Sequence, residues 1–250
     1  MRVPQPVIRV EFEPAAQSQV DAAKWPFTIP AVGQILSEGL DLSLGMTFVV
    51  GANGSGKSTI VEAVAAAYGM NPEGGSRHAH HRTRETQSPL HGCLRLVRDP
   101  RAPKWAYFLR SETLHGFLSY AEDTEDPARP NSASHGMSHG EAVLGLLRDN
   151  FTSGGFYELD EPESGLAFVA QLALIQTLRD IVSAGGQVLC ATHSPLLTAI
   201  PGATIIEAGD HGLRTSTWED LAEVRHWRAF LDTPERYLRP LGDDATEGSG

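Results

Sequence analysis

Along most of the chain, short runs of apolar residues alternate with longer stretches in which apolar residues recur every three or four positions. The short runs are typical of buried strands, and the longer stretches have the spacing of helices that pack on a sheet. Strands that alternate with helices predict an α/β fold, in which a mostly parallel sheet is flanked by helices. Strands are predicted at 46–50, 105–110, 156–159, 187–192 and 203–207.

Six parts of the sequence are predicted to be helical. The longest apolar stretch, at 166–178, is interrupted by Gln171 and Gln176, so we expect a core helix there and not a membrane span. Residues 7–12 instead alternate apolar and polar side chains, which predicts an edge strand. Helices are predicted at 58–68, 89–98, 112–120, 138–150, 165–183 and 217–240.

The length of 250 residues suits one large core, and we expect a single domain over residues 1–240. Two polar stretches, at 69–87 and 121–136, separate the first helix from the later strands. Residues of about 70–150 are therefore predicted to form an inserted helical lobe. The polar tail at 241–250 is predicted to be disordered.

The composition narrows the classes of protein to consider. Cys93 and Cys190 are the only cysteines, so we expect no disulfide framework and a reducing, cytoplasmic location. The amino terminus lacks the apolar segment of a secretory signal, and no apolar run is long enough to insert into a membrane. The formal net charge of −11 argues against binding of DNA over the whole surface, although basic residues at 77–84 or 95–104 suit a local patch.

A glycine-rich loop follows the predicted strand at 46–50 and opens the predicted helix at 58–68. Strand, loop and helix in this order are the arrangement of a phosphate-binding loop. Its glycines let backbone N–H groups face phosphate oxygens, its lysine brings a positive charge to the outer phosphates, and the next serine offers a hydroxyl to Mg²⁺. The positive end of the helix dipole faces the same anion. The predicted nucleotide-binding residues are Gly51, Ala52, Asn53, Gly54, Ser55, Gly56, Lys57, Ser58 and Thr59.

Two adjacent carboxylates, Asp160 and Glu161, come directly after the predicted strand at 156–159. The working loops of a parallel sheet lie at the carboxyl ends of its strands, so we expect both side chains near the phosphate-binding loop. Asp160 is predicted to hold Mg²⁺ together with Ser58, and Glu161 to orient and polarise the attacking water. The alternative is an acidic, solvated turn.

His193 and a short motif at 138–141 complete the candidate chemistry. His193 follows the predicted strand at 187–192, a position from which its ring reaches the γ-phosphate or the attacking water, whereas a lone histidine is more often structural. Ser138, Gly140 and Glu141 stand at the start of a predicted helix, which is a second site for an anion. A second phosphate site is needed only if the nucleotide is clamped between two protomers.

With these four motifs in order, the sequence resembles the ABC-type ATPases. It is most similar to the stand-alone cytoplasmic members of the recombination and chromosome-maintenance branch, often grouped with AAA-type predicted ATPases. The resemblance runs from about residue 25 to residue 207, and it implies a P-loop fold and two ATP molecules held in a head-to-tail dimer. By position, it makes 51–59 the Walker A loop, Asp160 the Walker B ligand of Mg²⁺, Glu161 the catalytic glutamate and His193 the switch histidine.

The same resemblance makes Ser138, Gly140 and Glu141 the signature motif, which caps the γ-phosphate of the partner and is carried by the inserted lobe. The motif reads Ser-His-Gly-Glu and not the transporter-like Leu-Ser-Gly-Gly-Gln, which argues against transport. The segment 162–166 lacks the usual aspartate of the loop that couples the two sites, so coupling between the sites does not follow from the resemblance.

Four residues are weaker candidates. An aromatic residue upstream of Walker A stacks on adenine in related proteins, which is a role for Trp25 or Phe27, with core packing as the alternative. No glutamine loop that senses Mg²⁺ is recognisable. Arg110 or Glu112, at the end of the predicted strand 105–110, stands in its place, and the alternative is a surface salt bridge.

The sequence therefore predicts an enzyme that binds ATP with Mg²⁺ and hydrolyses it to ADP and phosphate as a homodimer. A nucleotide-gated module for a protein or DNA partner, with slow hydrolysis, would use the same residues. The energising subunit of a transporter is a third alternative, and it requires a separate membrane partner.

Overall fold

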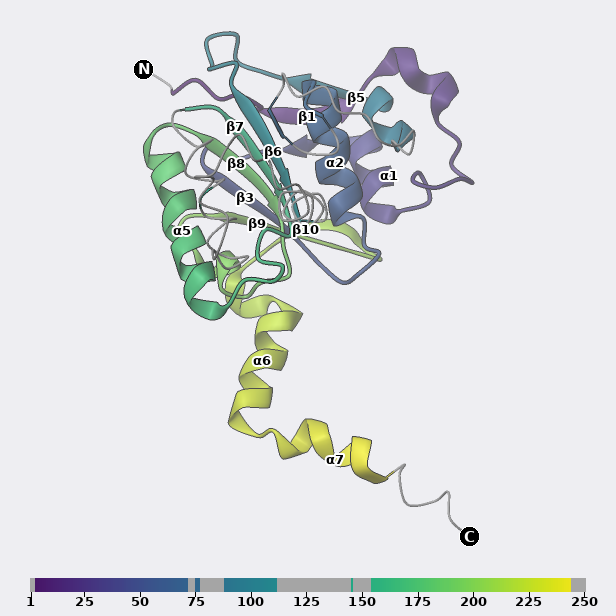
Figure 1. Cartoon of the computed structure of the whole chain (residues 1–250). Helices are drawn as coiled ribbons and strands as arrows, with labels where there is room; N and C mark the ends of the chain where they lie inside the picture. The colour runs from purple at the N-terminus through teal and green to yellow at the C-terminus, as the bar shows by residue number, and fades with distance from the viewer. Residues whose placement is uncertain (1–2, 72–74, 77–87, 112–144, 146–153, 244–250) are drawn as a thin grey trace, which may run out of the picture.

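The computed structural model describes residues 3–71, 75–76, 88–111, 145 and 154–243, and Figure 1 shows how their elements are arranged. At the centre is a seven-stranded sheet in the order β10-β9-β3-β8-β7-β6-β4. Its five inner strands run parallel, and the outer strands β10 and β4 are antiparallel to their neighbours. The strands are β3 (Met46–Val50), β4 (Gly75–Ser76), β6 (Ala106–Arg110), β7 (Phe156–Asp160), β8 (Gln187–Ala191), β9 (Thr204–Gly209) and β10 (Gly212–Ser216).

Helices cover both faces of this sheet (Figure 1). One core contains residues of α1 (Pro30–Glu38) and α2 (Lys57–Tyr68), and the other contains residues of α5 (Phe168–Ser183). Successive strand residues point into different cores: Phe156 packs in the first and Tyr157 in the second. Because both faces are covered, every residue of β3, β7 and β8 is buried. The predicted α/β fold with a mostly parallel sheet is confirmed.

A second sheet contains three antiparallel strands in the order β2 (Leu40–Asp41), β1 (Arg9–Phe12) and β5 (Leu94–Val97). The helix predicted at 89–98 is wrong, because a 3-10 helix over Pro89–Cys93 leads directly into β5. Pairing of β5 with β1 supplies hydrogen bonds that the local spacing of apolar residues does not reveal. For the same reason β1 is the middle strand of this sheet and not the edge strand predicted at 7–12.

The helix predicted at 165–183 begins later, at Phe168, because Gly165 has a φ of +75°, in the left-handed region that a helix cannot contain. Leu174 and Leu178 of α5 are buried as expected, whereas Phe168 at its start is exposed. In the part of the chain that the structure describes, no helix is long and apolar enough to cross a membrane.

The helix predicted at 217–240 is divided into a 3-10 turn (Trp218–Asp220), α6 (Ala222–Asp232) and α7 (Glu235–Asp243). Pro234 explains the break between α6 and α7, because a proline disfavours the helical conformation of the residue before it, and Thr233 has φ −148° and ψ 76°. α6 and α7 extend away from the sheet (Figure 1). α7 includes the first three residues of the predicted tail, at 241–243.

The remaining predictions about domain organisation lie mainly outside the described residues. They are most of the inserted lobe at about 70–150, with its helices at 112–120 and 138–150, and the tail from residue 244. These stay predictions. Within the range 70–150, the described residues 88–111 contain β5 and β6, which belong to the two sheets.

One residue of β7, Glu158, is an ionisable residue in an apolar environment. Its side chain is fully buried, and neither carboxylate oxygen has a hydrogen-bond partner among the described residues. Its register partners on the neighbouring strands are Phe108 and Leu189, both fully buried. Burial raises the pKa of Glu158 well above its usual range, because the charged form loses its hydration without gaining a partner.

We therefore expect Glu158→Leu to stabilise the fold by about 1–3 kcal/mol near neutral pH. The neutral acid is favoured in the folded state, so wild-type stability is greatest below the unfolded-state pKa of about 4.3 and falls as pH rises through the folded-state pKa. The Leu variant should lack this loss, and the difference between the two proteins should grow with pH. Urea unfolding at several pH values measures it, and a Leu variant no more stable than wild type at any pH would contradict the burial argument.

Candidate active site

The glycine-rich loop connects the end of β3, at Val50, to the start of α2, at Lys57. Gly51 has a φ of +146°, and a Cβ atom there would lie 2.2 Å from the backbone oxygen of Ala208 on β9. Gly56 has a φ of +98° where α2 begins, and a Cβ atom there would lie 2.7 Å from Ile29. The loop therefore passes too close to its neighbours for larger residues at these two positions, and it has the strand–loop–helix form that was predicted.

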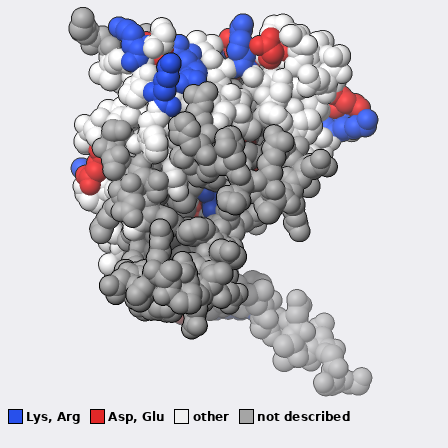
Figure 2. Space-filling model, turned by 45° about the horizontal axis from the view of Figure 1, so that its top comes forward, with Lys and Arg blue, Asp and Glu red and all other residues white. Residues whose placement is uncertain are grey.

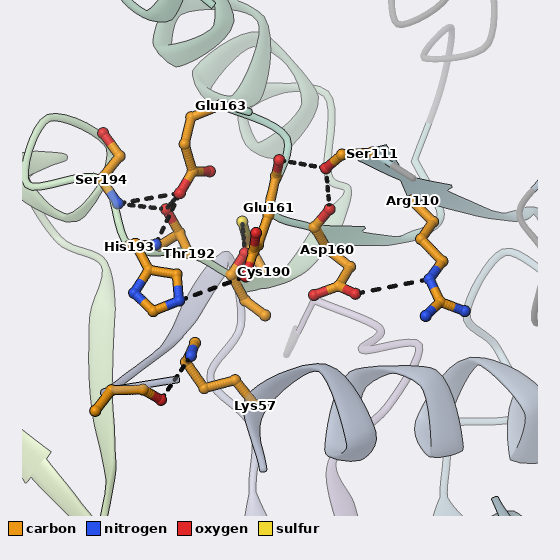
Figure 3. A network of polar contacts seen from close by, with 12 residues as sticks. Lys57, Arg110, Ser111, Asp160, Glu161, Glu163, Cys190, Thr192, His193 and Ser194 are labelled. Atoms are coloured by element: carbon orange, nitrogen blue, oxygen red, sulfur yellow. Dashed lines mark hydrogen bonds and ion pairs between the residues drawn. The ribbon is translucent and has the colours of Figure 1, made fainter. Parts of the chain in front are cut away.

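Lys57 is 4% exposed, and its ammonium group donates a hydrogen bond to the backbone oxygen of Ala52 at 3.1 Å. Burial lowers the pKa of Lys57, while the carboxylates of Glu161, Asp160 and Glu163 act in the opposite direction. The lysine of the loop thus faces the acidic residues that follow β7, as Figure 3 shows. A lysine at the end of a glycine-rich loop, next to the backbone N–H groups of that loop, is suited to binding an anion.

Asp160 ends β7 and lies opposite Arg110, the last residue of β6, in the parallel register. The guanidinium of Arg110 approaches the Asp160 carboxylate at 4.0 Å and the Glu62 carboxylate of α2 at 3.4 Å. For Arg110 the alternative to sensing Mg²⁺ was a surface salt bridge. The structure shows an ion pair, and this pair lies inside the site and not on the open surface. A role of Arg110 in sensing Mg²⁺ stays a prediction, and Glu112 lies outside the described residues.

Glu161 has a φ of +50°, a conformation that residues other than glycine adopt rarely. Hydrogen bonds hold it there. Its N–H donates to the oxygen of Ala191 at 2.9 Å, and the hydroxyl of Ser111 donates to the backbone oxygens of Glu161 and, at 2.7 Å, of Asp160. The backbone turns sharply at Glu161 as a result, and the carboxylate remains partly exposed.

His193 lies beside Glu161. Its Nε2 atom is 3.4 Å from Oε1 of Glu161, and both side chains are partly exposed (Figure 3). Because β7 and β8 are neighbours in the sheet, the residues that follow them meet at one edge. The structure thus brings together Lys57, Asp160, Glu161 and His193, as the sequence predicted.

Sequence reasoning missed Glu163 as a member of the site. One of its oxygens accepts hydrogen bonds from the hydroxyl of Thr192 and from the N–H groups of His193 and Ser194. The only available signal was the third carboxylate in the run Asp-Glu-Pro-Glu, and that run does not reveal a partner about 30 residues later in the chain.

A cavity of about 480 Å³ opens beside the glycine-rich loop. It lies between the loop residues 51–53, the segment 192–195, the β9–β10 turn and the start of α6. Lys57, Asp160 and Glu161 do not line it, so the cavity adjoins the polar cluster and does not coincide with it.

The other predicted positions are distributed as follows. The signature residues Ser138, Gly140 and Glu141 lie outside the described residues. Phe27 is 9% exposed and packs in the core with α1, as expected if it is a core residue and does not stack on adenine. Trp25 is 59% exposed. Of the two aromatic side chains, only that of Trp25 is open to a ligand.

In the basic patch predicted at 95–104, three arginine side chains contact other residues of the chain. Arg95 pairs with Glu11 at 2.7 Å, Arg101 pairs with Asp99 at 2.7 Å, and the guanidinium of Arg98 stacks on the ring of Tyr68 at 3.9 Å. Figure 2 shows basic side chains at the upper rim of the molecule, some of them next to acidic ones. Two of the four cations of this patch, Arg95 and Arg101, are therefore already paired with carboxylates of the same chain.

Two family models match the chain. Residues 28–91 match a model described as "AAA domain", and residues 107–199 match one described as "AAA domain, putative AbiEii toxin, Type IV TA system". The first match contains the glycine-rich loop, and the second contains Asp160, Glu161 and His193. Both models describe AAA domains, and each of them covers less than half of the chain.

Solved structures that are similar in fold to this chain include the following three. An ABC transporter in an inward-facing conformation has 16% identity and a TM-score of 0.44 over 78% of this chain and 80% of that one. An Smc head bound to the C-winged helix domain of ScpA has 14% identity and a TM-score of 0.44 over 71% and 92%.

A third structure, cbiO1 from Clostridium perfringens, part of the ABC transporter complex cbiONQ, has 13% identity and a TM-score of 0.43 over 79% and 88%. Likenesses at this level concern the fold and carry no argument about function. A search of curated proteins found no significant match.

Proposed function

We propose that the protein binds ATP with Mg²⁺ and hydrolyses it as a head-to-tail homodimer. The observation that carries this proposal is the meeting of three strand ends at one edge of the sheet. Lys57 in the loop after β3, Asp160 and Glu161 at the end of β7, and His193 after β8 all face the same space. This is the set of groups that ATP hydrolysis requires.

The residues present fit Mg²⁺. The hydroxyl of Ser58 and the carboxylate of Asp160 are oxygen donors, which this ion prefers, and the nucleotide phosphates and water supply its remaining ligands. Asp160 is nearly buried, and its carboxylate lies near two cations, Lys57 and Arg110. Bound with the nucleotide, Mg²⁺ neutralises charge on the outer phosphates.

In the proposed reaction, the loop 51–59 cradles the phosphates and Lys57 holds the outermost ones. Glu161 accepts a hydrogen bond from the attacking water and polarises it toward the γ-phosphate. His193, beside Glu161, orients the same water or the phosphate. The unusual backbone conformation of Glu161 supports this assignment, because residues held in such conformations cluster at functional sites.

The proposed dimer completes the site with Ser138, Gly140 and Glu141 of the partner, at the N-terminus of a helix that caps the γ-phosphate. We propose a cytoplasmic location, which agrees with the two cysteines being free and buried. Adenine stacking by Trp25 is proposed on its exposure.

One feature supports a second function, the nucleotide-gated interaction module. The start of α6 lines the cavity beside the phosphate-binding loop, and the rest of α6 exposes Trp227 and Leu231, which is 72% exposed. Exposed large apolar side chains are typical of protein-binding surfaces. A DNA partner and the role of a transporter subunit have no such support in the described residues.

Ser138→Arg tests both the reaction and the dimer. Phosphate release by wild type should require Mg²⁺ and stop with a chelator. The arginine should lower turnover by about 10²-fold, because a cap on the partner's γ-phosphate is lost. The affinity of the single chain for ATP, measured by calorimetry, should stay within about threefold.

Full activity of Ser138→Arg would exclude the signature role. A wild-type protein that binds ATP but releases phosphate at most once, slowly, would favour the interaction module.

A further inference from the structure

Glu163 holds the chain segment that carries His193. Its Oε1 atom accepts three hydrogen bonds, from the hydroxyl of Thr192 at 2.6 Å, from the N–H of His193 at 2.7 Å and from the N–H of Ser194 at 3.1 Å (Figure 3). The donors are consecutive residues, so one carboxylate oxygen fixes the backbone of the whole segment.

These bonds begin where the sheet stops supporting the chain. The N–H of Thr192 still donates to the oxygen of Val49 on β3, at 3.2 Å, but the N–H of His193 donates to Glu163. The N–H of Ser194 is shared between Glu163, at 3.1 Å, and the hydroxyl of Thr192, at 2.9 Å, and that hydroxyl is itself held by Glu163. Hydrogen bonds from N–H groups to a carboxylate are among the stronger ones in proteins, and a buried N–H left without an acceptor is costly. Glu163 therefore replaces the missing strand partner beyond the end of β8.

A second connection joins the same two segments. The hydroxyl of Ser194 donates to the amide oxygen of Gln171 on α5 at 2.7 Å, and the amide nitrogen of Gln171 donates to the oxygen of Leu166 at 3.1 Å. The turn after β7, which contains Glu161 and Glu163, is thus linked twice to the segment after β8.

The consequence concerns the 3.4 Å contact between His193 and Glu161. Glu161 is held by its own hydrogen bonds, to Ala191 at the end of β8 and from Ser111 after β6, while the backbone of His193 is held by Glu163. We infer that Glu163 is a positioning residue, which keeps the ring of His193 against Glu161 and makes the two segments a single unit. Oε1 of Glu163 accepts from three protein donors, while Oε2 is buried and has no hydrogen-bond partner among the described residues. This inference rests on the proposed ATP hydrolysis.

The test compares Glu163→Ala and Glu163→Gln with wild type. Alanine removes the acceptor, whereas glutamine keeps an oxygen that accepts the same three hydrogen bonds without the charge. Glu11→Ala is a matched control, because Glu11 accepts two hydrogen bonds from Arg95 in the small sheet, far along the chain from the site.

The first readout is the split between turnover and binding. Glu163→Ala should lower kcat by about 10- to 100-fold and leave the Kd for ATP within about threefold. Glu163→Gln should lose less than about tenfold, and Glu11→Ala should match wild type. Wild-type kcat in Glu163→Ala, or equal losses in the Ala and Gln variants, would overturn the positioning role.

The second readout does not need ATP hydrolysis. The indole N–H of Trp218 donates to the backbone oxygen of Pro195 at 2.8 Å, directly after the segment that Glu163 holds. The chain has four tryptophans, so the ¹H–¹⁵N spectrum shows only four indole signals, and Trp218→Phe assigns the one concerned. This signal should move in Glu163→Ala and stay close to wild type in Glu163→Gln and Glu11→Ala.

The two readouts separate failure of the inference from failure of the proposed function. If wild type does not hydrolyse ATP, the proposed function fails and the indole signal alone decides whether Glu163 holds the segment. An unchanged Trp218 signal in a folded Glu163→Ala protein overturns the inference in either case.

Discussion

Glu161→Gln should lower the rate of ATP hydrolysis by about 10²- to 10⁴-fold without loss of ATP binding, because a carboxylate that polarises water is replaced by an amide that cannot. The side-chain shape is kept, and the backbone bonds that hold residue 161, from its N–H to Ala191 and from Ser111 to its oxygen, do not involve the side chain. Removal of one negative charge beside Asp160 should also reduce repulsion of the triphosphate, so ATP should bind at least as tightly.

The same variant should accumulate the closed state. If two protomers enclose the nucleotide, slow hydrolysis leaves ATP in place, and Glu161→Gln should form a dimer with ATP that wild type forms only transiently. Single-turnover phosphate release and sedimentation with ATP or ADP measure the two effects. Glu11→Gln, an isosteric change in the small sheet, is the control. A monomer of Glu161→Gln at saturating ATP would rule out the head-to-tail dimer.

Lys57→Ala should weaken ATP binding by about 10²-fold, since a charge-assisted contact with the phosphates contributes about 1.5–3 kcal/mol. The apo protein should remain folded. Among the described residues the ammonium group donates one hydrogen bond, to Ala52, and burial lowers its pKa, so its removal relieves a desolvation cost.

Calorimetric titration with ATP and Mg²⁺ measures the change, and the increase in Tm with added ATP checks it independently, because a ligand that binds only the folded state stabilises it. Lys24→Ala is the matched control, since Lys24 is exposed and paired with Asp21 at 3.1 Å. Unchanged affinity in Lys57→Ala would remove this lysine from its proposed role.

The parts of the site that are contiguous in sequence were predictable. The glycine-rich loop, the pair Asp160–Glu161 and His193 each follow an apolar run, and the loop and the pair are recognisable from neighbouring residues alone. That these runs form one parallel sheet then places their ends together. Lys57 was recognisable as the lysine of the glycine-rich loop from the local sequence alone.

The parts that depend on distant partners were not predictable. β5 has the apolar content of a short helix, and only its pairing with β1, about 80 residues earlier in the chain, makes it a strand. Glu163 reads as one more acid in a polar turn until the fold brings it to Thr192 and the two residues that follow. In both cases the deciding contact joins segments that no local pattern connects.

The place where α6 begins has a mechanical consequence. Its first turn lines the cavity next to the glycine-rich loop. Trp218, which precedes α6, donates a hydrogen bond to the backbone oxygen of Pro195. The eleven residues of α6 extend about 16 Å, so a tilt of about 10° at this root displaces the far end by about 3 Å. A small tilt at the start of α6 would therefore produce a larger displacement at its end. A spectroscopic label near Leu231 would detect such displacements when the chain around His193 shifts.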